Sequence, residues 1–267
     1  MRIMTVKDIM GCITEIAPLQ WQEDYDNAGL QVGDVNREIH KALVALDVTE
    51  AVVDEAIAKS CDLIISHHPL IFKGLKHLTP QTYIERAVVN AIKHDVAIVS
   101  MHTNLDNSYL GVSCVLAERL GLSHLRILQP SSMAPELCGA GMIGVFENPM
   151  EETAFLALVA EQLGTPCLRH SAFTGRKIRT VALCGGSGSP FLDDALANHV
   201  DAYLTADIKY HDFFVPENRL LLIDGGHFET EQFTKELIKD LIQKKIPNFA
   251  AEIAETNTNA VHYYCKK

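Results

Sequence analysis

The sequence has no apolar run near the ~18 residues of a membrane-spanning helix. Its 23 Lys and Arg are outnumbered by 34 Asp and Glu, which gives a net charge of −11. Duplex nucleic acid needs clustered positive charge, so we do not expect it as a partner. Charged residues from Arg2 to Asp8 interrupt the apolar pattern at the N-terminus, so no secretory signal is expected there.

Paired cysteines are also missing. The seven cysteines are an odd number and form no C-x-x-C pair, so neither a disulfide framework nor a zinc ribbon is expected. Free thiols suit a reducing compartment, and we therefore expect a cytoplasmic protein. With 267 residues, 48% of them apolar, the chain is long enough to bury a core without disulfides or a structural metal.

Short apolar strand patterns alternate with helical patterns along most of the chain, and this alternation is typical of an α/β fold with a largely parallel sheet. Caps are expected at Thr5, at Thr49 and at Thr79-Pro80. The expected strands are 41–48, 62–66 and 96–101, and the expected helices are 5–17, 49–60, 79–94 and 111–120.

The segment 126–175 has a different texture. It contains a glycine-rich strand candidate at 137–146 and a helix at 151–163 that Gly164 ends, and the alternation resumes at Ile178. We therefore predict two α/β lobes. The first comprises 1–125 with 222–267 and carries most of the candidate ligands, and the second comprises 126–221.

An internal repeat supports two related units. Residues 54–59 resemble 193–198, and in the same register 62–66 match 201–205. One strand later, 98–106 match 223–231, so each unit ends a strand with a histidine and an acid four residues on.

Histidines and acids follow the ends of three predicted strands, where functional groups gather in open α/β sheets. They are His67 with His68, His102 with Asp106, and His227 with Glu231. Neighbouring side chains on a strand point to opposite faces, so His67 and His68 are expected to serve two different ions. The alternatives are packing histidines, an Asx turn at Asp106 and a helix-capping role for Glu231.

Imidazole with carboxylate is a donor set that suits Zn, Mn, Fe or Ni better than Ca or Mg. Two such ions that share a carboxylate can activate water for hydrolysis. The glycine-rich loop 185–190 has two interpretations, a phosphate cradle or a tight turn with Ser189 as the helix cap. It lacks the dinucleotide fingerprint, which excludes a Rossmann dehydrogenase.

Five segments together resemble the dinuclear-metal family of GTP cyclohydrolase 1 type 2 homologues, also called Ngg-interacting-factor-like proteins. Where many members have Thr-Gly-Asp, this chain has Thr205-Ala206-Asp207. The segments are DNAGLQVG (26–33), ISHHPLIF (65–72), HTNLD (102–106), TADIKYH (205–211) and DGGHFETE (224–231).

The resemblance implies two related α/β subdomains with mostly parallel sheets flanked by helices, a ring-shaped homohexamer and two divalent ions per subunit. His67 and His227 would bind one ion and His68 and Asp106 the other, with Glu231 as the bridge. His102 and His211 are the candidate catalytic residues, as proton shuttles.

We therefore predict a metal-dependent hydrolase that acts on a small molecule, a nucleotide or a purine-like heterocycle. The alternative is a non-catalytic metal-binding adaptor or metal-handling protein.

Overall fold

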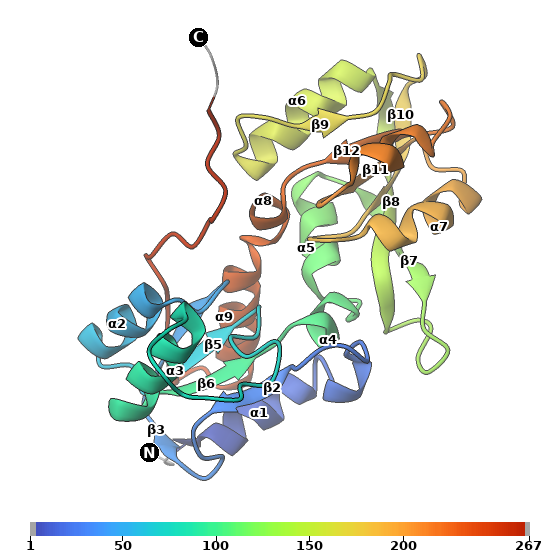
Figure 1. Ribbon diagram of the computed structural model, residues 1–267. Coiled ribbons are helices and arrows are strands. Elements are labelled where there is room, and N and C mark those ends of the chain that lie inside the picture. The colour runs from blue at the N-terminus through green and yellow to red at the C-terminus, as the bar shows by residue number, and fades with distance from the viewer. Residues whose placement is uncertain (1–3, 265–267) are drawn as a thin grey trace. The chain divides into compact units, whose positions relative to one another are not determined.

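The computed structural model describes residues 4–264 and divides into two compact units (Figure 1). One contains the described residues up to Leu105 with Thr234–Ala260, and the other contains Asp106–Phe233 with the described residues from Val261. These bounds differ from the expected lobes, because 106–125, 222–233 and the described residues from Val261 belong to the second unit. There the helix α5 (Val112–Arg119) packs on that unit's strands.

The first unit contains a five-stranded sheet. Four neighbouring strands are parallel and only the edge strand β2 is antiparallel, so the expected mostly parallel sheet is confirmed here. In spatial order the strands are β13 (Ala250–Ile253), β4 (Lys41–Ala45), β5 (Leu63–Ser66), β6 (Ala97–Ser100) and β2 (Gly29–Val32). A separate pair joins β1 (Met4–Thr5) to β3 (Glu38–Ile39).

Helices cover both faces of this sheet (Figure 1). Leu43, Ile64 and Ile98 point to the face that α2 and α3 bury. The helix α9 packs on β13 and β4, and α1 packs against α9. The helices of this unit are α1 (Val6–Thr14), η1 (Leu19–Trp21), α2 (Glu50–Ala58), α3 (Tyr83–Lys93) and α9 (Thr234–Lys245), and α4 (Thr103–Asp106) ends at the boundary.

The helix caps test the local sequence signals. Thr5 forms the predicted capping box with Asp8, and Thr49 caps α2 by accepting from the Val52 amide. The expected start at Thr79-Pro80 is wrong, because Thr82 caps α3. The Thr79 hydroxyl instead donates to a carboxylate oxygen of the first helical turn.

The second unit contains a six-stranded mixed sheet. Only β10, β11 and β12 are mutually parallel, so the prediction of a mostly parallel sheet is wrong here. The loop 131–138 between β7 and β8 contains no crossover helix, and such a loop joins antiparallel neighbours. In spatial order the strands are β7 (Ser123–Pro130), β8 (Gly139–Met150), β10 (Ile178–Leu183), β11 (Ala202–Thr205), β12 (Leu221–Asp224) and β9 (Arg169–His170).

The two faces of this sheet carry separate apolar clusters. Val181, Leu183 and Leu204 pack with α5 and α6, whereas Ala182 and Tyr203 pack with α7. Gly164 ends α6 in the left-handed region with a φ of 65°, as predicted. The other helices of this unit are α6 (Glu152–Leu163), η2 (Ser189–Phe191), α7 (Leu192–Ala197), η3 (Tyr210–Phe214) and α8 (His227–Glu231).

The first part of the predicted repeat, 62–66 against 201–205, has the same local structure in each unit. The second part is displaced by one residue in its strand, because Ser100 pairs with Ser66 whereas Asp224, not Gly225, pairs with Thr205. The Asp62 carboxylate accepts from the backbone amides of residues 40 and 41, and the Asp201 carboxylate accepts from those of 179 and 180. Just before these acids, Ser60 and His199 both adopt positive φ, 54° and 52°. Each carboxylate thereby ties the start of one parallel strand to the start of the next.

Two expectations from composition concern the whole described chain. Between residues 4 and 264, no helix combines the length and the apolar character that crossing a membrane requires. Of the six cysteines in that range, none forms a disulfide, and four are buried.

Candidate metal centre

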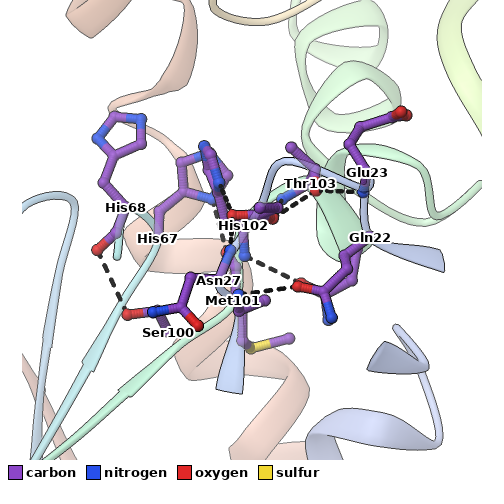
Figure 2. A network of polar contacts seen from close by, with 12 residues as sticks. Gln22, Glu23, Asn27, His67, His68, Ser100, Met101, His102 and Thr103 are labelled. Atoms are coloured by element: carbon purple, nitrogen blue, oxygen red, sulfur yellow. Dashed lines mark hydrogen bonds and ion pairs between the residues drawn. The ribbon is translucent and has the colours of Figure 1, made fainter. Parts of the chain in front are cut away.

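Three histidines of the first unit gather where β5 and β6 end (Figure 2). The ring centroids of His67 and His68 are 4.8 Å apart, and both rings lie within 5.5 Å of the His102 ring. The expectation that His67 and His68 point to opposite faces is wrong. The strand β5 ends at Ser66, so the alternation of a regular strand no longer orients them.

Each of these rings is held through Nδ1. His67 Nδ1 lies 2.8 Å from the Met101 carbonyl oxygen, and His68 Nδ1 lies 2.7 Å from Asp47 Oδ1. His102 Nδ1 lies 2.6 Å from Asp26 Oδ1. Metal-binding histidines typically bond to a carbonyl or carboxylate through one ring nitrogen, which orients the other nitrogen toward the metal. In this cluster that second nitrogen is Nε2.

The carboxylates Asp26 and Asp47 were not identified as functional residues from the sequence. Asp26 also accepts from the amide and hydroxyl groups of Thr103. Burial raises the pKa of Asp26, but the hydrogen bonds from His102 and Thr103 lower it more, to about 2. Asp47 accepts from the Thr258 hydroxyl at 2.6 Å. Asp47 follows β4, so the strand-end criterion used for the histidines points to it as well.

The second unit carries an acidic cluster, formed by Asp207, His227 and Glu231, at the ends of β11 and β12. His227 begins α8 and Glu231 ends it, and His227 Nε2 lies 3.0 Å from Glu231 Oε2. His227 Nδ1 lies 2.7 Å from Asp207 Oδ2. Two atoms that each lie ~2.0–2.1 Å from one ion are about 3 Å apart, so the His227–Glu231 separation suits two ligands of the same metal.

Charge is concentrated in this acidic cluster. Burial lowers the pKa of His227, but hydrogen bonds to Asp207 and Glu231 raise it more, to about 11. The hydrogen bond with His227 lowers the pKa of Asp207. Burial raises the pKa of the Cys184 thiol, and the charges of Asp106 and Glu231 raise it further. Asp106 and Glu231 therefore both act on one buried thiol of this unit.

The glycine-rich loop after β10 makes room for Glu231. Gly186 has a φ of 60°, and a Cβ atom there would collide with the Glu231 carboxylate. The Gly186 amide donates to the Thr230 hydroxyl at 3.0 Å, which ties the loop to α8. The expectation that Ser189 caps the next helix is wrong, because Gly188 occupies that position without a side-chain bond.

Comparison with known proteins agrees with the resemblance inferred from the sequence. The family described as Duf34/NIF3 (NGG1p interacting factor 3) matches residues 4–260. The chain belongs to this family. A GTP cyclohydrolase 1 type 2 homolog of Clostridium acetobutylicum is 34% identical over 231 residues, which cover 85% of each protein. One from Streptococcus pneumoniae is 31% identical over 268 residues, which cover 97% of this chain and all of the relative.

Solved structures resemble this NIF3-family chain over almost its whole length. A Staphylococcus aureus protein has a TM-score of 0.89 at 29% identity and covers 98% of this chain and 99% of its own. A Bacillus cereus protein related to NIF3 has a TM-score of 0.93 at 23% identity and covers 99% of this chain and all of its own. The second likeness shows the shared fold.

Asp224 positions the acidic cluster of the NIF3-family chain, and sequence reasoning gave it no role. It ends β12, and its Oδ2 accepts from the Ile208 amide at 3.1 Å and from Arg169 at 2.7 Å. Its Oδ1 accepts from the Gly226 amide at 3.1 Å. One carboxylate thus connects the loop that carries Asp207 with the turn that precedes His227.

The two candidate proton shuttles lie in different surroundings. His102 belongs to the histidine cluster of the first unit. His211 lies exposed on η3 in the second unit, where its ring packs against Tyr210 and Phe214 at centroid distances of 5.2 and 6.4 Å.

Proposed function

We propose that this NIF3-family protein binds divalent metal ions and uses them to hydrolyse a small molecule. The observation that carries the proposal is that the ligand histidines follow strand ends and are oriented by similar hydrogen bonds. His67, His68 and His227 each bond through Nδ1 to a carbonyl or carboxylate oxygen, as metal-binding histidines do. The proposed ligands are His67, His68, Asp106, His227 and Glu231.

The donor set fits borderline divalent cations. Three imidazoles and two carboxylates favour Zn, Mn, Fe or Ni, and the absent Cβ of Gly186 leaves room for Glu231. We assign two ions to each chain, with Glu231 as the shared ligand. Such ions, when bound, polarise the substrate and lower the pKa of water, which is the chemistry that hydrolysis needs.

The protein's own groups orient this centre and move protons. Asp47 and Asp207 hold the rings of His68 and His227, which keeps each Nε2 aimed in one direction. His102 is held by Asp26 in the same way and is our first candidate for proton transfer. His211, on the exposed η3 turn, is the second.

The substrate class follows from the relatives' name, GTP cyclohydrolase 1 type 2 homolog, and we propose a nucleotide or a purine-like heterocycle. We further propose that the chain assembles into a ring-shaped homohexamer. Sedimentation analysis tests this assembly: six chains of 29.5 kDa give about 177 kDa. A monomer or dimer at working concentration would exclude the ring.

The decisive experiment combines metal content with turnover. Untagged protein is reconstituted with each metal, analysed for bound metal and assayed against nucleoside triphosphates and phosphoesters. We expect two equivalents per chain and hydrolysis of one substrate class, and we expect His68→Ala to lose both. His94→Ala is the matched control, because His94 also bonds through Nδ1 to a carbonyl, that of Asn90 in its own helix, but lies exposed and follows no strand end.

Two outcomes would change the conclusion. Wild-type protein that holds no metal after reconstitution would contradict the proposed centre. Two bound equivalents without turnover of any substrate would contradict the hydrolase and favour a metal-binding adaptor.

A further inference from the structure

A cavity of about 330 Å³ opens in the second unit at the amino ends of the parallel strands. The acidic cluster lies at the carboxyl ends of the same strands, so the two sites are distinct. Arg176 precedes β10, His199 and Asp201 precede β11, and Arg219 precedes β12. The lining residues are Arg176, Leu196, His199, Val200, Asp201 and Arg219.

Backbone carbonyls hold both arginines in place. Arg176 Nη2 donates to the Arg219 carbonyl at 2.5 Å. Arg219 donates to the carbonyls of Val215 and Pro216 at 3.0 and 3.2 Å. A carbonyl oxygen orients a guanidinium without cancelling its charge, so the cavity carries two ordered cations.

Nearby carboxylates neutralise this pair only in part. The lining also holds the Asp201 carboxylate, which accepts from two backbone amides at the start of β10 and keeps its charge, so two arginines and one aspartate leave the lining with a net positive charge. Glu217 is 79% exposed, and its Oε2 lies 3.9 Å from Arg219 Nη2, where solvent screens the attraction. The exposed His199 adds a third group that can carry positive charge.

The first unit has positions that are structurally equivalent to those of Arg219 and Arg176. The Ala97 amide donates to the Asp62 carbonyl at 3.0 Å, and the Leu221 amide donates to the Asp201 carbonyl at 2.9 Å. Two residues before these amides stand Asp95 in the first unit and Arg219 in the second. A second pair of positions also matches. Arg37 lies two residues before the buried Ile39, and Arg176 lies two residues before the buried Ile178.

The charge at these positions differs between the units. In the first unit Arg37 forms an ion pair with Asp95. In the second unit Arg219 takes the place of the acid, so Arg176 has a second cation beside it. The matching cavity of the first unit, of about 240 Å³, has no arginine among its lining residues Ile57, Ser60, Cys61, Asp62, His94 and Val96.

We propose that the cavity of the second unit binds an oxyanion of the phosphate type. An external anion would take the role that Asp95 has in the first unit. Guanidinium groups bind phosphate oxygens through paired, charge-assisted hydrogen bonds, and two ordered arginines are suited to this geometry. Inorganic phosphate and a phosphomonoester share the chemistry.

Thermal unfolding of the metal-free full chain tests the site. Phosphate is titrated against chloride at constant ionic strength, and we expect phosphate to raise Tm by about 3 °C at ten times its Kd. Arg219→Asp recreates the Arg37–Asp95 pairing and should abolish the phosphate-dependent rise. Arg176→Gln should reduce it and decides the case if Arg219→Asp does not fold.

Arg179→Asp is the matched control, because it makes the same charge change on an exposed side chain outside the cavity lining. It should keep the phosphate-dependent rise. An equal Tm rise in chloride, or an undiminished rise in both cavity variants, would overturn the proposal. Ribose 5-phosphate distinguishes the sources: a larger rise than with inorganic phosphate indicates a phosphorylated small molecule, and a smaller one indicates the free anion.

Discussion

The two units build the same strand-end geometry with different donors. His102 in the first unit and His227 in the second each bond through Nδ1 to an aspartate, at 2.6 and 2.7 Å. Around His102 gather two more imidazoles, whereas around His227 gather carboxylates. The comparison shows that the sheet supplies the positions of the donors and that the residues placed there supply the chemistry.

The units also differ by one residue where the site begins. Ser66 pairs with Ser100 in the first unit, and Thr205 pairs with Asp224 in the second. One residue then separates the strand from its histidine in the first unit, but two glycines do so in the second. Gly226, with a φ of 88°, is the additional residue, and its amide donates to the Asp224 carboxylate. The insertion therefore connects the strand end to the acidic cluster.

The largest effect is expected from Gly186→Ala, which changes a contact within the second unit. The new Cβ would collide with the Glu231 carboxylate, so we expect metal affinity to fall by at least about 100-fold. Gly175→Ala is the matched control, because Gly175 also has positive φ, 72°, but open space around it. It should cost only about 1 kcal/mol of stability. Competition with a chelator measures affinity, and wild-type binding by Gly186→Ala would refute the role of Glu231.

Next in size is the loss of the carboxylates that hold the rings. Asp47→Asn in the first unit and Asp207→Asn in the second should each weaken metal binding about 10–100-fold, because the imidazole loses its charged partner. Asp54→Asn is the control, since Asp54 bonds to Asn90 on an exposed surface. If chelator competition finds only one of the two variants impaired, only that carboxylate supports metal binding. Two unimpaired variants would contradict the assignment.

A smaller effect should be equal in both units. Asp62→Ala and Asp201→Ala each remove a carboxylate that accepts from two backbone amides, so we expect each to lower the free energy of unfolding by about 1–3 kcal/mol. Urea unfolding, followed by a probe in each unit, measures the cost. A cost confined to one unit would show that the repeated turn has lost its structural role in the other.

The smallest effect concerns pH and the first unit. Burial raises the pKa of Glu55, but hydrogen bonds from Lys59 and Thr256 lower it more, from 4.5 to about 2. Because the pKa is lowered in the folded state, Glu55 stabilises above pH 4.5, and this stability is lost as pH falls toward 2. Glu55→Gln should cost about 1 kcal/mol at pH 7, since solvent screens the pair. As pH falls from 7 toward 2, the free energy of unfolding of Glu55→Gln should approach that of the wild type. A difference that does not depend on pH would show that the ionised Glu55 carboxylate is not the source of the stability.

Local signals in the sequence predicted local structure well. Thr5, Thr49 and Gly164 act as caps because the atoms that they bond lie within a few residues of them. The start of α3 was misplaced because Thr79 and Thr82 are both suitable caps, and only the packed chain distinguishes them. Strand direction in the second sheet was also misjudged, because an apolar run does not encode whether its neighbour is parallel.

The sequence alone determined which residues follow the strands. A histidine or acid that comes directly after an apolar strand lies at the carboxyl end of that strand in the sheet. The tertiary structure decided which groups hold these side chains. Asp26 bonds to His102 across 76 residues and Asp47 bonds to His68 across 21. Hydrogen bonds act over about 3 Å, so such partners appear only after strand pairing has brought distant segments together.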